Sequence, residues 1–186
     1  MNYNPLEEYF FTRLMKKRPI CIPGHGQHIT GLGHVEDLAS AMANVIGKET
    51  TKGQIYNIQD TQSVSFESLA LLCATAMGQD PSKVKIKYYD KDMFDFSGKK
   101  AFPMREQHFF CSGKRVIIYV IFSSNNALYK FIICYKVDKA MADLEWSPKY
   151  DMLSGLKDSY ENDFLHKMVF LSIFNMFWKQ FLLMIL

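Results

Sequence analysis

The sequence has few cysteines, and none of them is spaced for a metal site. Its four cysteines are scattered over 186 residues without a C-x-x-C pair, which argues against a zinc site and against a dense disulfide framework. Isolated thiols in a reducing compartment are therefore expected at Cys21, Cys73, Cys111 and Cys134.

A strong charge of one sign and a leader segment are lacking as well. The formal net charge is +3, which neither demands nor excludes a nucleic-acid partner, since phosphate binding needs a local basic patch. The opening residues MNYNPLEEYF form neither a signal peptide nor a Ser- and Arg-rich transit peptide, so any targeting signal is expected upstream of Met1. With 48% hydrophobic residues, the chain is expected to bury a core.

Phosphate-binding glycine motifs are missing, although the stretch PGHGQHITGLGHVEDLA is rich in glycine. A dinucleotide-binding G-x-G-x-x-G turn would need a third glycine where Ile29 stands, and no G-x-x-x-x-G-K-[ST] loop occurs. No Asp, Glu or Cys completes a metal-ligand spacing with the three histidines of this stretch. We expect a turning loop in which Gln27 and His28 line a cleft, and a helix-start role for Asp37.

Helical and strand-like patterns alternate along the chain, which predicts the α/β class. Asn4 and Ser65 are suitable N-caps, and Gly47 is a suitable helix end. A first helix is predicted from Asn4 to the basic run at 16–18, and further helices are predicted at 35–46, 65–78, 139–144 and 152–164. Strands are predicted at 19–23, 53–58 and 83–89, followed by a polar-aromatic loop at 90–110.

Two apolar segments interrupt this pattern. The tail 165–186 is long enough to span a membrane, but His166, Lys167 and Lys179 interrupt it, so a membrane span is not expected. Segment 113–136 is rich in Ile, Phe and Tyr and has a turn-like SSNN centre, so it is either an inserted hairpin or a translated intron. We favour the intron, because its removal joins HFFCS directly to VDKAMADLEW, and we interpret the tail as a similar readthrough.

Several blocks carry a resemblance to a known family. IPGHGQHITGLGHVEDLASAMANVIG followed by GQIYNI resembles the carboxy-terminal half of extended short-chain dehydrogenase/reductases, the NAD-dependent epimerase/dehydratase superfamily. NYNPLEEYFFTRL, FDFSGKKAFPMREQHFF and LEWSPKYDMLSGLKDSYENDF are more specifically similar to the chloroplast stem-loop-binding protein family, in its b-type branch. The resemblance covers Asn2 to Phe164 apart from 113–136.

The resemblance implies the carboxy-terminal part of a Rossmann-like fold without its dinucleotide-binding half. Residues 1–164 would be a partial domain, and the tail would not belong to it. Because the missing half supplies most of the parallel sheet, apolar helix faces and unpaired strand edges are expected to be exposed. The glycine-rich turn and the Tyr-x-x-x-Lys counterpart are absent, so no cofactor is expected in this fragment, whereas NAD or a divalent metal is possible in full-length relatives.

The resemblance also implies a stromal chloroplast protein that binds stem-loop RNA and supports transcript and rRNA processing, transcript stability and plastid gene expression. Relatives suggest endoribonuclease activity, ribosomal or transcription complexes and homo- or hetero-oligomers as partners, but no catalytic residue is assigned here and this chain alone is expected to be inactive. Two other hypotheses stay open, namely the substrate half of a nucleotide-sugar epimerase or dehydratase and a non-functional mis-spliced product.

The candidate RNA- or anion-binding residues are polar, basic or aromatic. Arginine forks suit phosphate oxygens and a ring at position 108 would stack on a base, whereas lysines would provide salt-sensitive affinity. Each has a simpler interpretation as a solvated side chain, a core ring or a sheet-edge lysine. The candidates are Arg18, Gln27, His28, Lys99, Lys100, Arg105 and His108, with Lys83, Lys85 and Lys87 as supporting cations.

Overall fold

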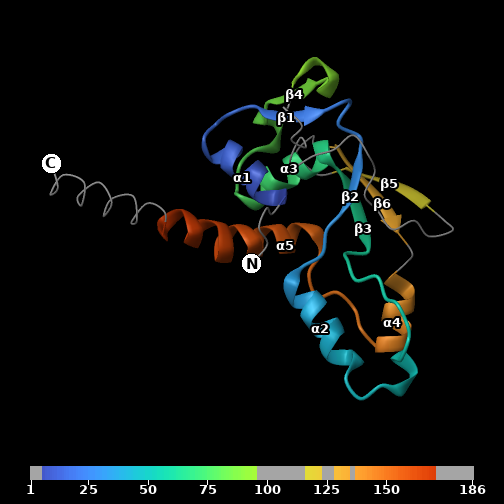
Figure 1. Ribbon diagram of the computed structural model, residues 1–186. Coiled ribbons are helices and arrows are strands. Elements are labelled where there is room, and N and C mark those ends of the chain that lie inside the picture. The colour runs from blue at the N-terminus through green and yellow to red at the C-terminus, as the bar shows by residue number, and fades with distance from the viewer. Residues whose placement is uncertain (1–5, 96–115, 123–127, 135–136, 171–186) are drawn as a thin grey trace, which may run out of the picture.

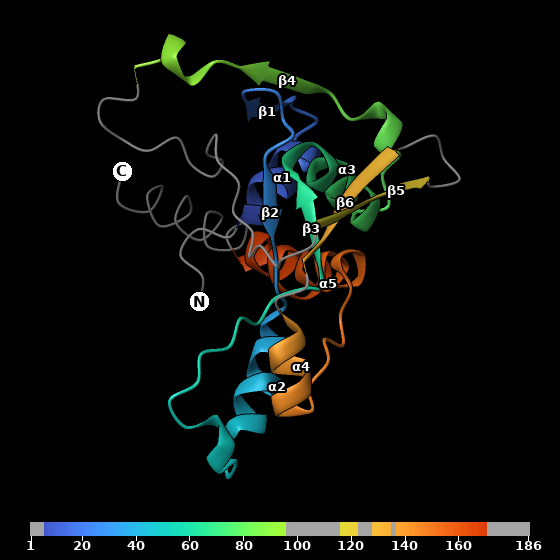
Figure 2. The same ribbon diagram turned by 90° about the vertical axis from the view of Figure 1, so that its right-hand side faces the viewer.

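The computed structural model describes residues 6–95, 116–122, 128–134 and 137–170 (Figure 1). Its body consists of helices that pack between a pair of parallel strands and a carboxy-terminal helix. Seen from two sides, α1 and α3 lie between the β1–β4 pair and α5 (Figures 1 and 2). The bounds of these elements are Leu6–Met15 for α1, Ile20–Pro23 for β1, Phe66–Ala76 for α3, Ile86–Tyr89 for β4 and Met152–Asp158 for α5.

The core of the body is aromatic and aliphatic, and it forms where the apolar stripe of α1 meets α3. Phe10 and Phe11 are completely buried, as is Leu69 on α3. The Phe11 ring also contacts the rings of Tyr160 and Phe164, with centroids 5.3 and 5.4 Å apart. The helix predicted at the start of the chain is thereby confirmed over Leu6–Met15, whereas its predicted cap Asn4 lies outside the described residues. The buried stripe of this helix joins the two ends of the described chain.

A second sheet is antiparallel and has the strand order β2-β3-β6-β5. Its strands come from distant parts of the sequence, and β3 pairs with both β2 and β6. Strands β5 and β6 pair in register from Val116↔Cys134 to Phe122↔Leu128, so the hairpin expected of an inserted segment forms at the backbone level. An intron origin of the segment stays a prediction. The bounds are Ile29–Gly31 for β2, Gln62–Ser65 for β3, Val116–Phe122 for β5 and Leu128–Cys134 for β6.

A smaller lobe contains α2 (Val35–Val45) and α4 (Asp138–Leu144). Both helices were predicted, at 35–46 and 139–144. Its buried cluster is small and centres on Trp146, whose indole Nε1 donates to the Asp37 carbonyl at 3.1 Å and to Ser40 Oγ at 2.9 Å. Short 3-10 turns complete the described chain at Glu49–Thr51 (η1), Pro81–Lys83 (η2) and Lys91–Met93 (η3).

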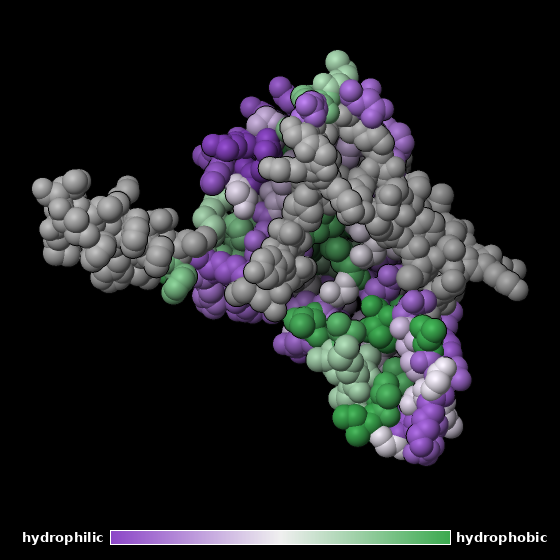
Figure 3. All heavy atoms as spheres, viewed as in Figure 1, coloured by the Kyte–Doolittle hydropathy of each residue, from purple (hydrophilic) through white to green (hydrophobic). Residues whose placement is uncertain are grey.

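Apolar side chains of this lobe face solvent, as expected for a partial domain. Val35 is 72% exposed and Met42 is 62% exposed on α2. Ile46 and Ile55, which follow this helix, are 83% and 84% exposed. Figure 3 shows hydrophobic side chains, in green, gathered over much of this lobe, beside hydrophilic side chains, in purple, along its edge.

The strand predicted at 53–58 is wrong. These residues form no strand, and the described sheet instead uses Gln62–Ser65, which the sequence analysis did not predict. A strand requires a neighbour for its backbone N–H and C=O groups, and the described sheets do not run alongside 53–58. The apolar pattern of GQIYNI is therefore present without a partner to pair with.

The helix predicted at 152–164 is interrupted in its hydrogen-bond pattern. It starts with a capping box at Asp151 and Ser154, is α-helical through α5, and then becomes π-helical over Ser159–Phe164 (η5). Helical residues continue over 165–170. Among the described residues no helix is long and apolar enough to cross a membrane, and most of the apolar tail lies outside that range.

Candidate functional site

Exposed cations gather at one end of the β1–β4 pair. They come from the turn after α1 and from the approach to β4, which are about 65 residues apart in the sequence, and parallel pairing of β1 with β4 brings them together. We call the set the basic cluster. Its members are Lys16, Lys17, Arg18, Lys83, Lys85 and Lys87, all of them exposed.

Backbone hydrogen bonds fix the two sides of the basic cluster against each other. The Arg18 N–H donates to the Arg13 carbonyl at 2.8 Å, which closes the turn after α1 with Lys17 at a φ of 52°. The Ile20 N–H then donates to the Lys85 carbonyl at 2.8 Å. The predicted candidate Arg18 therefore lies beside the predicted lysines of the β4 segment.

Most cations of the basic cluster form no ion pair with a described carboxylate. Lys83 is 3.7 Å from Asp80, but both side chains face solvent, so this ion pair is weak. In the described part of the chain, ion pairs do not involve the other five cations. Free, adjacent cations on a folded surface suit an anion with many charges.

Gln27 and His28 lie at the opposite end of β1, in the glycine loop that follows the strand. The Gln27 amide donates to the Glu67 carboxylate on α3, and the His25 and His28 rings stack with centroids 4.7 Å apart. Gly26 has a φ of +74°, and a Cβ there would meet the Tyr88 ring at 2.6 Å, so glycine is required. The structure thus brings Gln27 and His28 together, while β1 separates them from Arg18.

The later glycines of the same stretch make room for one side chain. A Cβ on Gly31 would meet Gln59 Oε1 at 2.8 Å, and a Cβ on Gly33 would meet the Gln59 Cα at 3.2 Å. These glycines allow the chain to pass Gln59 closely on its way to α2. The predicted turning loop is therefore confirmed only in part: the chain turns at Gly24 and Gly26, where φ is positive, and then forms β2 before it reaches α2.

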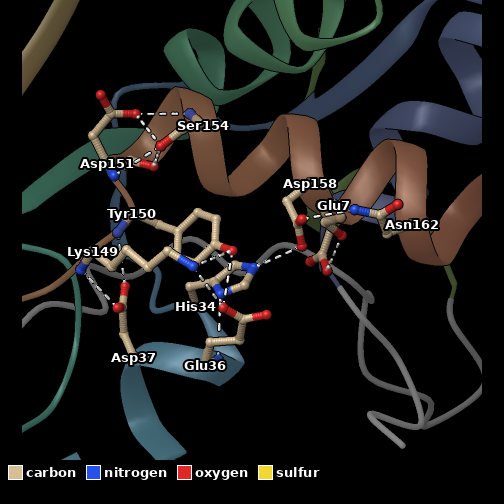
Figure 4. Close-up of polar contacts among 11 residues, drawn as sticks. Glu7, His34, Glu36, Asp37, Lys149, Tyr150, Asp151, Ser154, Asp158 and Asn162 are labelled. Atoms are coloured by element: carbon tan, nitrogen blue, oxygen red, sulfur yellow. Dashed lines mark hydrogen bonds and ion pairs between the residues drawn. The ribbon is translucent and has the colours of Figure 1, made fainter. Parts of the chain in front are cut away.

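A cavity of about 530 Å³ lies on the other side of the body, between α1, α5 and the start of α2. Its polar lining is mainly acidic, and Figure 4 shows the side chains gathered around His34. The carboxylates that line it are Glu7, Asp60, Asp151, Asp158 and Asp163. A phosphate would be repelled here, so the anion-binding function cannot be assigned to this cavity.

His34 holds the cavity together through both ring nitrogens. Its Nδ1 accepts from the Glu36 N–H at 3.3 Å and caps α2, which leaves the proton on Nε2. That Nε2 lies 3.0 Å from Asp158 Oδ2 and donates to it, and the ring stacks on Tyr150 at a centroid distance of 3.7 Å. With both nitrogens engaged, His34 joins α2 to α5 and is not placed as a free general base.

Asp37 does more than the helix-start role that was expected. Its carboxylate is buried and accepts from the Lys149 N–H at 2.7 Å and from the Tyr150 N–H at 3.2 Å. These bonds tie α2 to the loop before α5, 112 residues further along the chain. Sequence reasoning missed this role because no local pattern marks so distant a partner.

Burial and hydrogen bonds separate the carboxyls of the cavity into two kinds. Burial raises the pKa of Glu7, and it raises the pKa of Asp60 to about 6. The Ser154 N–H and hydroxyl lower the pKa of Asp151, and hydrogen bonds from Asn162 and then His34 lower that of Asp158. Of the five carboxyls, Asp151 and Asp158 are therefore firmly ionised near neutral pH, whereas Glu7 and Asp60 are more readily protonated.

The remaining predicted candidates, Lys99, Lys100, Arg105 and His108, lie outside the described residues. Within the described range, groups of three or more His, Cys, Asp or Glu side chains suited to a metal ion do not occur. The buried Cys73 has a pKa raised by burial, so it is an unreactive core thiol.

Comparison with known proteins shows which family the chain resembles. No protein-family model matches the sequence. A curated relative, chloroplast stem-loop binding protein of 41 kDa b from Arabidopsis thaliana, is 42% identical over 165 residues, which are 88% of this chain and 36% of the relative. The chain belongs to the chloroplast stem-loop binding protein family. It spans little more than a third of that relative's length.

Solved structures confirm the fold expected for the family. UDP-glucose 4-epimerase from Thermotoga maritima matches with a TM-score of 0.56 at 18% identity, over 89% of this chain and 40% of that one. dTDP-glucose 4,6-dehydratase from Bacillus anthracis matches with a TM-score of 0.53 at 17% identity, over 86% and 40%. The chain therefore has part of the Rossmann-like fold of these epimerase and dehydratase structures.

Proposed function

We propose that this chain is part of a plastid protein that binds stem-loop RNA, and that the basic cluster contacts the RNA backbone. The observation that supports the proposal is the gathering of free cations from two distant segments on the β1–β4 ribbon. The name of the Arabidopsis thaliana relative describes a chloroplast protein that binds stem-loops. The acidic cavity, which would repel phosphates, lies on another side of the body.

Contacts of this kind bind RNA through counterion release. Each phosphate neutralised by a lysine or arginine adds a slope of roughly −0.7 to −0.9 to the dependence of log affinity on log salt. Such contacts position the RNA without reading its sequence. Cleavage, rRNA processing, ribosomal or transcriptional partners and oligomers stay predictions for longer relatives, and no residue described here is assigned to catalysis.

The test measures binding of a fluorescent stem-loop RNA at several salt concentrations. The variant R18Q/K85Q/K87Q should bind more weakly, and its salt slope should be flatter by roughly 2 to 3. The control K52Q/K157Q removes two exposed lysines from other surfaces that each have a carboxylate partner, and it should bind as the wild type does. Equal affinity and slope for the triple variant and the wild type would refute the proposal.

The epimerase-like fold supports a second candidate, binding of a nucleotide-sugar. The same protein provides the comparison, because a ligand that binds the native state raises the melting temperature by mass action. Under the RNA-binding proposal, a stem-loop RNA raises the melting temperature and UDP-glucose leaves it unchanged. The reverse result would favour the nucleotide-sugar hypothesis.

A further inference from the structure

The face of β4 that carries the lysines ends in an aromatic pair. Side chains alternate along a strand, so Lys87 and Tyr89 project from one side of β4, and Lys85 directly precedes the strand. Tyr89 meets Phe94 edge to face, with ring centroids 5.7 Å apart and planes at 87°. A row of cations therefore leads directly to a pair of rings.

Phe94 is exposed and follows a turn that brings it to Tyr89. Its side chain is 55% exposed, although it belongs to the largest apolar residue types. Asp90 folds the chain back after β4, because its carboxylate accepts from the Asp92 N–H at 2.9 Å and its carbonyl from the Met93 N–H at 3.3 Å. This turn brings Phe94 against Tyr89, so an aromatic side chain that contacts its neighbour also faces solvent in part.

We propose that Phe94 stacks on an unpaired base of the RNA loop while Lys85 and Lys87 hold the adjoining phosphates. The proposal rests on the function proposed above and names the part of the RNA that this surface recognises. Bases inside a stem are already stacked on their neighbours, whereas loop bases can be splayed out and stacked on a protein ring. Stacking of this kind tolerates any base, because every base has an aromatic face.

Charge around the ring favours a base over a phosphate. The exposed carboxylates Asp90 and Asp92 flank the turn that carries Phe94 and would repel the RNA backbone from this end. Tyr88, on the opposite face of β4, is exposed as well, and burial and then the nearby Glu67 carboxylate raise the pKa of its hydroxyl. The lysine row and Phe94 thus form one surface, and Tyr88 provides an aromatic control on the other side.

The experiment compares two RNA probes with the same stem, one closed by an unpaired loop and one a blunt duplex. Wild-type protein should bind the stem-loop more tightly than the duplex. F94L keeps an apolar side chain but removes the ring, so it should weaken stem-loop binding by roughly 5- to 100-fold and leave duplex binding unchanged. F94W should restore stem-loop binding, and Y88L should leave the preference for the stem-loop intact.

The outcomes separate this proposal from the function on which it rests. If neither probe binds, or if R18Q/K85Q/K87Q binds both as the wild type does, the proposed RNA-binding function fails. If the triple variant loses both probes while F94L keeps full preference for the stem-loop, the basic cluster binds RNA and the stacking proposal is refuted. If F94L weakens both probes equally and F94W does not restore binding, the role of the ring is structural and the stacking proposal is also refuted.

Discussion

The body and the lobe of this chain differ in how completely they bury their apolar side chains. The body packs α1, α3 and α5 around completely buried residues such as Phe10, Phe11 and Leu69. The lobe buries a small cluster around Trp146, while Val35 and Met42 on α2 stay exposed. Both regions have amphipathic helices, so the difference lies in whether the chain provides a partner for each apolar face.

The junction between the two regions is polar rather than apolar. His34 and Asp37, at the start of α2, bond to Asp158 and to the backbone of Lys149 and Tyr150. Hydrogen bonds need defined geometry, so they fix the orientation of the lobe on the body. They do not bury the exposed apolar side chains of α2, such as Val35 and Met42. Covering of that stripe by a further part of a longer polypeptide stays a prediction.

The largest effect on stability is expected in the body. Phe11→Ala would leave a cavity between α1, Tyr160 and Phe164, and the free energy of unfolding should fall by about 3–5 kcal/mol. Urea denaturation followed by circular dichroism would measure it. A loss below about 1 kcal/mol would mean that the body is not the stable region of the chain.

A smaller, pH-dependent effect is expected at the junction, where Asp60 lines the cavity. Because burial raises its pKa from 3.8 to about 6, the folded state holds a proton that the unfolded state has released between these values. Stability from this group is therefore present at low pH and is lost as the pH rises through about 6. Asp60→Asn removes the titration and should stabilise the protein at pH 7 by roughly 1–3 kcal/mol.

The measurement for Asp60 is the difference in unfolding free energy between wild type and D60N from pH 4 to 7. Comparing the two proteins cancels the titration of Glu7, whose pKa is also raised, and that of Asp151 and Asp158, whose pKa values are lowered. The advantage of D60N should grow as the pH rises. A difference that is constant over this range would contradict the burial of the ionised carboxylate.

Local signals in the sequence predicted most of the body, and long-range partners explain the failures. The Ser65 cap and Gly47, with a φ of +80°, were predicted correctly because each acts within one helical turn. Residues 53–58 have a strand pattern, but a strand forms only beside another strand. β3 was missed because its sequence QSVS is polar and its partners lie far away in the chain.

The candidate site also depends on long-range partners that local sequence patterns do not predict. Arg18 and the strand lysines could be predicted one by one as anion-binding candidates. Their meeting depends on the parallel register of β1 with β4, in which Ile20 pairs with Ile86, and no local pattern encodes it. Phe94 was missed for a related reason, since the Asp90 turn that returns it to Tyr89 is recognised only once β4 is placed.

The smallest change in stability is expected on the exposed stripe of the lobe. Val35→Lys and Met42→Lys replace side chains that are 72% and 62% exposed, so the free energy of unfolding should change by less than about 0.5 kcal/mol. Binding of a dye such as ANS should fall, because exposed apolar patches attract it. Size-exclusion chromatography should show less self-association. If the double variant instead unfolded as readily as Phe11→Ala, α2 would be packed in solution against another surface, and the contrast between body and lobe would not hold.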